Sequence, residues 1–141
     1  MRYKHLYWLL ALAIVAITLV AQRPDTEVNG TVRLVGSLGS RTVWGPPGFG
    51  ETPDQDQRAE IFVLQLDMPK NEEDLGLVPT PEVETEYSEV QLVCRSKEVA
   101  KCEERLRETA GKHVSLRGRA EYAVYPSDYL PIVVDVLSIE P

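Results

Sequence analysis

The sequence has few of the residues from which metal sites and catalytic centres are usually built. Two cysteines and two histidines occur among 141 residues, and His113 is the only histidine outside an apolar N-terminal segment. A structural zinc site usually takes four cysteine or histidine ligands, and a serine nucleophile often lies in a Gly-x-Ser-x-Gly turn, which this sequence lacks. The residues therefore predict no catalytic group, no metal and no cofactor.

Basic residues are also scarce. The chain has 15 lysines and arginines against 22 aspartates and glutamates, a formal net charge of −7. Without Arg2 and Lys4, residues 22–141 carry 13 basic and 22 acidic side chains, a net charge of −9. A nucleic-acid-binding surface normally has a basic excess. The composition therefore predicts that nucleic acid is not a partner.

The length allows one domain of ordinary size. If the first 21 of the 141 residues form a targeting segment, 120 remain for a folded part. A chain of that length buries roughly two-thirds of its unfolded surface, enough for one core. Large multidomain enzymes, repeat arrays and polytopic transporters are excluded.

The N-terminus has the pattern of an export or anchor segment. Arg2 and Lys4 precede an apolar run at residues 6–21, and this order is typical of secretory signals and signal anchors. The run reaches about 24 Å as a helix, against a hydrocarbon core of about 30 Å. Residues 1–21 are interpreted as a signal peptide or a single-pass membrane anchor, and 22–27 as a linker. Either interpretation places the domain at 28–141 in the cell envelope, in the periplasm or anchored in the inner membrane on its outer side.

The two cysteines, Cys94 and Cys102, are an even pair in an exported chain, the setting in which disulfides persist. Closing a loop of this length stabilises a fold by about 2–3 kcal/mol in the chain-entropy model. We expect a disulfide, with two free structural thiols or a metal-binding or redox role as the alternatives.

Residues 28–141 read as mostly strand with one helix. Period-two alternation begins at 28–35, and Gly36 and Gly39 suggest a bend or bulge before a second extended piece at 41–44. Apolar residues three and four apart then predict a helix at 97–109, with Ser96 as its N-cap and Gly111 at its end. The remaining expected strands are residues 59–66, 90–93, 114–122 and 132–139.

This inventory of about five strands, with one helix between the third and fourth, predicts a mainly β fold. The oligonucleotide/oligosaccharide-binding barrel, or OB-fold, closes five strands into a small Greek-key barrel. Its helix covers one end between those same two strands. We therefore expect an OB-like five-stranded barrel preceded by an N-terminal apolar helix.

The stretch GPPGFGETPDQDQRAEIFVLQLDMP (45–69) resembles the signature of exported bacterial proteins catalogued as domain of unknown function 4431. Blocks at 89–93, 111–120 and 130–139 resemble the same family in the same order. The resemblance implies an OB-like barrel on the extracytoplasmic side, and it implies no reaction. The family often has histidines between its last two strands, whereas 121–131 contains none.

The segment at 45–57, GPPGFGETPDQDQ, packs three glycines and three prolines into thirteen residues and predicts a shaped loop. It is interpreted as a structural loop, with the rim of a binding site as an alternative. A cation site at Asp54 and Asp56 is a further alternative, although the spacing lacks the glycine and terminal glutamate of an EF-hand.

Aromatic residues gather near this loop and near a second one. In OB-folds such residues stack on extended ligands, although in a small barrel they often only pack. Given the acidic charge, an envelope protein, a peptide or a glycan is the expected partner. The candidate binding residues are Trp44, Phe49, Tyr122, Tyr125 and Tyr129.

The stretch 67–86 is polar, acidic and proline-containing, and it predicts a long exposed loop whose carboxylates are solvated. With no catalytic constellation, the sequence predicts a noncatalytic extracytoplasmic binding module. The alternative is an assembly subunit held in a membrane complex by an uncleaved N-terminal helix.

Overall fold

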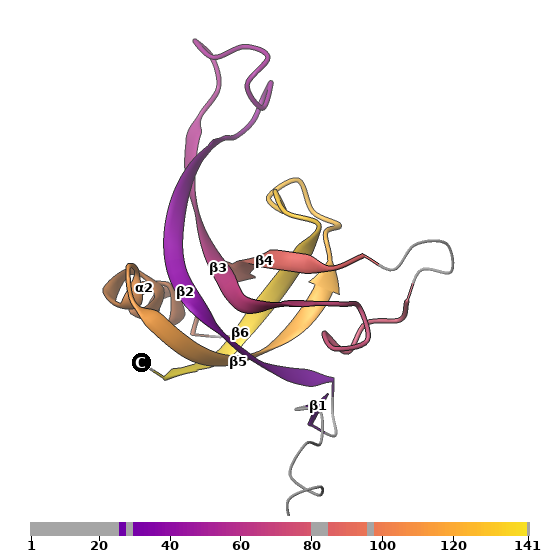
Figure 1. The fold of residues 1–141 in the computed structure, drawn as a ribbon. Helices are drawn as coiled ribbons and strands as arrows, with labels where there is room; N and C mark the ends of the chain where they lie inside the picture. Colours follow the sequence, from indigo (N-terminus) through magenta and orange to yellow (C-terminus); the bar gives the residue numbers. More distant parts are fainter. Residues whose placement is uncertain (1–25, 28–29, 80–84, 96–97, 141) are drawn as a thin grey trace, which may run out of the picture.

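The computed structural model describes residues 26–27, 30–79, 85–95 and 98–140. The predicted signal or anchor segment at 1–21 lies outside this part of the chain. Strands predominate among the described residues, and one α-helix accompanies them (Figure 1). The elements are β1 (Thr26–Glu27), β2 (Thr31–Trp44), β3 (Arg58–Lys70), β4 (Tyr87–Val93), α2 (Val99–Thr109), β5 (His113–Tyr122) and β6 (Ile132–Glu140).

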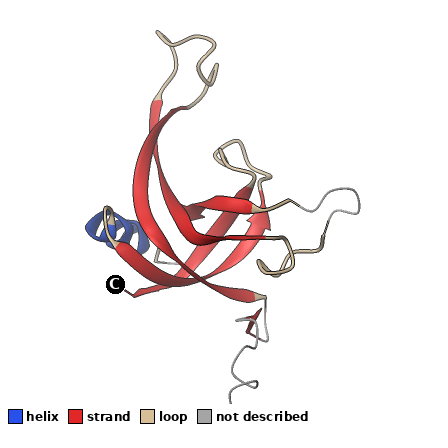
Figure 2. Cartoon of the chain, in the orientation of Figure 1, coloured by secondary structure: helices blue, strands red, loops and turns tan. Residues whose placement is uncertain are grey.

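The strands close into a barrel. The sheet order is β1-β2-β3-β4-β6-β5, and β5 pairs back onto β2, so that five strands form a ring (Figure 2). The β4–β6 pair is parallel and the other pairs are antiparallel. The prediction of a mainly β fold with one helix between the third and fourth barrel strands is confirmed. The last two residues of the predicted linker form β1, which pairs with β2.

Alternation along the strands builds the core. In β2 the side chains of Val32, Leu34 and Leu38 are buried while the residues between them are mostly exposed, as expected when one face of a sheet is covered. The other strands contribute the rest of the same cluster. Its members there include Phe62, Leu64, Leu66, Val90, Leu92, Val114, Leu116, Ile132, Val134, Val136 and Ile139.

One long strand replaces the two predicted extended pieces at the N-terminal end of the domain. β2 runs without interruption from Thr31 to Trp44, pairing with β5 up to Ser37 and with β3 from Gly36 onward. Gly36 belongs to both pairings. A Cβ built there would overlap the Gln65 carbonyl oxygen and lie 3.0 Å from the Leu66 Cα. The glycine therefore allows close approach of two strands where the ring closes, and it does not end the strand.

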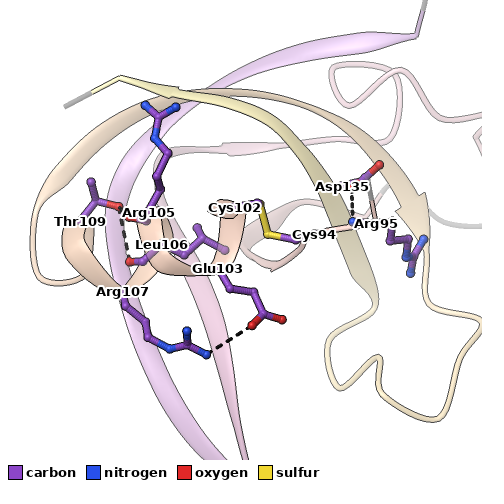
Figure 3. Close-up of a disulfide and its surroundings, with 9 residues drawn as sticks. All are labelled: Cys94, Arg95, Cys102, Glu103, Arg105, Leu106, Arg107, Thr109 and Asp135. Carbon is purple, nitrogen blue, oxygen red and sulfur yellow. Dashed lines mark hydrogen bonds and ion pairs between the residues drawn. A yellow bond between two sulfur atoms is a disulfide. The ribbon is translucent and has the colours of Figure 1, made fainter. Parts of the chain in front are cut away.

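Helix α2 is attached to the barrel through one face. Leu106 is its buried residue, and the Arg105 guanidinium donates to the Ile139 carbonyl at 2.8 Å. Cys102 forms the predicted disulfide with Cys94 just after β4 (Figure 3). The C-terminal end is as expected, since Gly111 has φ of 82° and its N–H donates to the Leu38 carbonyl.

The predicted helix start is wrong. Glu98, not Ser96, is the N-cap residue, and its carbonyl accepts the first helical hydrogen bond from Cys102 at 3.0 Å. The helix begins at Val99, two residues later than predicted.

The acidic segment is less exposed than predicted. Strand β3 continues to Lys70, and a turn follows in which Leu75 is fully buried. Glu72 is only 4% exposed, so its assignment as a solvated charge is wrong. Its carboxylate accepts a hydrogen bond from the Tyr87 hydroxyl at 3.4 Å. Burial, together with the negative charge of Glu72, raises the pKa of Tyr87.

Candidate functional site

The loop between β2 and β3, residues 45–57, is called here the glycine-proline loop. It is organised by one carboxylate, that of Asp56. Asp56 accepts backbone N–H groups from Gly48 at 2.6 Å, Gly50 at 2.7 Å and Thr52 at 3.2 Å, and the Thr52 hydroxyl at 3.0 Å. These donors occupy both carboxylate oxygens, so the loop is shaped around an internal anion. This arrangement supports the structural interpretation of the loop.

Asp56 makes the shape of this loop depend on pH. Desolvation alone would raise the pKa of Asp56, but the hydrogen bonds from Gly48, Gly50 and Thr52 hold it below its ordinary value. The stabilisation from the carboxylate is therefore present above the ordinary pKa of about 3.9. It is lost as the pH falls from there through the lowered folded-state value.

We expect Asp56→Ala to release the amides of Gly48 and Gly50 at neutral pH, because their acceptor is removed. The same change should develop in the unmodified protein as the pH falls below about 4. Two-dimensional NMR would follow the two amide resonances and their hydrogen exchange. Asp54→Ala is the matched control, since Asp54 is exposed in the same loop. Unchanged Gly48 and Gly50 signals in Asp56→Ala would contradict the assignment.

Trp44 anchors the start of this loop. It lies opposite Arg58 in the β2–β3 register, and the Arg58 guanidinium carbon is 3.5 Å from the indole ring centroid. A Cβ on Gly50 would lie 3.2 Å from the Trp44 ring. One face of the indole is thus covered by a cation and its edge by the loop backbone.

A second loop, residues 123–131 between β5 and β6, is called here the tyrosine loop. Asp128 shapes it by accepting the N–H groups of Val124 and Tyr125, each at 3.0 Å. Gln91, buried on β4, fastens the loop to the barrel. Its amide donates to the Ser127 carbonyl at 2.9 Å, and its oxygen accepts the Tyr129 N–H at 2.7 Å. This loop is consequently held against β4.

The two loops meet at their aromatic residues. Phe49 has a positive φ of 51° and is 47% exposed, and its ring centroid is 6.5 Å from that of Tyr129. Tyr125 is 57% exposed and lies under the Arg95 guanidinium, whose carbon is 4.8 Å from the ring centroid. The molecule thus presents partly exposed rings from both loops on one side of the barrel.

A groove of about 830 Å³ runs between these loops. One wall is residues 59–62 of β3, and the other is residues 91–95 at the end of β4. Phe49 and residues 125–129, from the two loops, also line the groove, and α2 contributes Glu103, Leu106 and Arg107. The arrangement suits an extended ligand lying along the strands.

The cations of the groove are already engaged. Arg95 forms ion pairs with Glu121 and with Asp128, in addition to its contact with Tyr125. Arg107 pairs with Glu103 across one turn of α2 at 3.3 Å (Figure 3). Glu60, in contrast, is exposed and forms no ion pair with another described residue. The groove therefore offers an uncompensated negative charge.

The structure brings three of the five candidate binding residues together. Phe49, Tyr125 and Tyr129 line the groove. Trp44 does not line it, and Tyr122 packs partly against the core while its hydroxyl donates to the Val78 carbonyl at 2.9 Å. The sequence pattern gave no signal for the other groove residues. These are chiefly Glu60, Ile61, Gln91, Arg95 and Arg107.

Neither a metal centre nor a membrane span is found in the described part of the chain. No cluster of three or more histidine, cysteine, aspartate or glutamate side chains there is placed to hold a metal ion. His113 lies at the surface with its Nε2 2.8 Å from Asp67. Across residues 26–27, 30–79, 85–95 and 98–140, no helix has the length and apolar content needed to cross a bilayer.

Comparison with known proteins does not add to this description. The resemblance of the 45–69 stretch to the exported bacterial family stays a prediction. The chain matches no protein-family model, no curated protein and no solved structure.

Proposed function

We propose that the protein is a noncatalytic binding module whose ligand lies in the groove between the glycine-proline loop and the tyrosine loop. The observation that carries the proposal is the meeting of Phe49, Tyr125 and Tyr129 around one groove. Ligand pockets are typically apolar concavities with a few placed polar groups. Here the polar groups are those of Arg95 and Glu60.

The OB-like order of the barrel strands supports the face with the groove as the binding face. Ring order β2-β3-β4-β6-β5, with the helix after the third ring strand, is the plan expected of that fold. OB-folds bind extended ligands on the face of their second and third strands, between the loops that follow the first and fourth. In this chain those parts are β3, β4, the glycine-proline loop and the tyrosine loop.

We place the module outside the cytoplasm. One support is the sequence of residues 1–21, in which basic residues precede an apolar run. The other is the Cys94–Cys102 disulfide, because disulfides persist in oxidising compartments. If residues 1–21 remain attached, the module is an anchored subunit that can also assemble through that helix. Intact-mass measurement of the protein from its native envelope distinguishes the two, since a cleaved species begins near Gln22.

The proposal is tested by screening the full chain, in mild detergent, on immobilised peptide and glycan arrays. For any ligand found, Tyr125→Ala should weaken binding by about tenfold or more, because it removes an exposed ring that lines the groove. Val124→Ala is the matched control, since Val124 is 71% exposed in the same loop and does not line the groove. Equal affinity of both variants and the unmodified chain would remove the groove as the site. Absence of any ligand on both arrays would count against a binding module.

A further inference from the structure

The hairpin of β2 and β3 extends beyond the rest of the barrel. β2 and β3 stay paired as far as Trp44 and Arg58, whereas pairing of β3 with β4 stops at Phe62 and Leu92. Figure 1 shows the two strands continuing past the level of β4 toward the glycine-proline loop. Residues 58–61 of β3 therefore have a strand partner on one edge only, within the described residues.

The direction of the free backbone groups follows from the register. The Gly45 N–H donates to the Gln57 carbonyl at 2.7 Å, so the position one step beyond Trp44 and Arg58 in the register is bonded across the hairpin. In antiparallel strands hydrogen-bonded pairs alternate with non-bonded ones, and the β2–β3 register runs from Trp44 to Gly36 without a shift. Ala59 and Ile61 thus bond to β2, while the N–H and C=O of Glu60 point to the open edge.

This open edge is part of the groove. Residues 59–62 line the groove, together with residues 91–95, within which β4 ends at Val93. A row of unpaired backbone donors and acceptors is a template for one more strand. The donors and acceptors along such an edge repeat every two residues, at about 6.8 Å, which is the repeat of a polypeptide strand. A sugar chain has no such repeat of paired donor and acceptor.

From these observations, and resting on the binding function proposed above, we infer that the ligand is an extended segment of a partner polypeptide. The segment adds to the free edge of β3 as a strand in line with β4, and its backbone bonds to Glu60. Its side chains alternate between the two faces of the sheet. The one opposite Glu60 is basic, because the Glu60 carboxylate is the uncompensated charge there, and its neighbours are apolar, facing the side of Ile61.

Selection from a random twelve-residue peptide library with the full chain tests the inference. Enriched peptides should place one basic residue between apolar residues. Methylating their backbone nitrogens one at a time should weaken binding at least tenfold at the position paired with Glu60, and little at the adjacent positions. Equal sensitivity at all positions, or at none, would overturn strand addition. This readout requires no change to the protein.

Glu60→Pro tests the same edge from the protein side. Proline removes the N–H that points into the groove and leaves the hydrogen bonds of Ala59 and Ile61 to β2 in place, so the fold should persist. We expect at least tenfold weaker peptide binding. Glu60→Gln is the control: it keeps the edge and should lose only the preference for a basic residue.

The outcomes separate this inference from the proposed function. Selected peptides that bind Glu60→Pro normally but fail on Tyr125→Ala would leave a groove ligand and overturn strand addition. Binding of glycans alone would do the same. A dimer of the full chain that disappears in Glu60→Pro would assign the edge to a second copy and overturn the peptide partner. No ligand of any kind would overturn both proposals.

Discussion

Gly36→Ala is expected to lower the free energy of unfolding by at least about 3 kcal/mol, because overpacking against backbone cannot be relieved by a rotamer change. The added Cβ would overlap the Gln65 carbonyl oxygen and come within 3.0 Å of the Leu66 Cα. Both atoms belong to β3, which pairs with β2 from Gly36 onward. Urea unfolding of the full chain in mild detergent, followed by circular dichroism, measures the loss.

The same strand contains a matched control for this substitution. A Cβ on Gly39 meets no heavy atom within 4 Å, and its φ is not in the left-handed region. Gly39→Ala should leave stability unchanged or raise it by up to about 1 kcal/mol, because alanine restricts the unfolded chain. Equal behaviour of the two variants would mean that strand approach at Gly36 does not limit the fold.

Leu106→Ala should cost between about 2 and about 5 kcal/mol, the range for removing a large buried aliphatic side chain. Leu106 is the buried residue of α2, at 1% exposure, and it belongs to the same core cluster as Phe62 and Leu92. The Cys94–Cys102 disulfide still ties the helix to the end of β4. We therefore expect weaker packing between α2 and the barrel while the helix stays attached. Urea unfolding gives the stability, and hydrogen exchange of the α2 amides reports the loosening.

Val99→Ala is the comparison for Leu106→Ala, because Val99 lies on the same helix and is 39% exposed. It should change stability by less than about 1 kcal/mol. A similar small loss at Leu106 would show that the helix does not contribute to the core.

Much of the fold was predictable from side-chain periodicity. The alternation of Val32 and Leu34, and the three-and-four spacing around Leu106, predicted a strand and a helix that the structure contains. The predictions failed where contacts between residues far apart in the chain, and not local sequence signals, decide the structure. Gly36 resembled a break because the sequence does not show the neighbouring strand that it accommodates. The helix begins at Val99 after Glu98, whose side chain makes no cap hydrogen bond, so no local cap signal reveals its start.

The candidate site was predictable only in part. Exposed aromatics in turn-rich segments indicated Phe49, Tyr125 and Tyr129, since loops tolerate large side chains that a strand would have to bury. Gln91 carried no signal, because a polar residue within a short strand gives no indication that it will fasten a loop from 36 residues away. The exposure of one β3 edge likewise depends on where β4 ends.

Composition and spacing by themselves determined the acidic charge, the β-rich class, the helix around Leu106 and the cysteine pair, because these depend on residue types and on intervals of a few positions. Tertiary structure decided that Trp44 is covered by Arg58, that Glu72 is buried, and that two distant loops form one groove. Those outcomes depend on strand register and barrel closure. Register arises from contacts between residues far apart in the chain, and hydrophobic periodicity does not encode which of them meet.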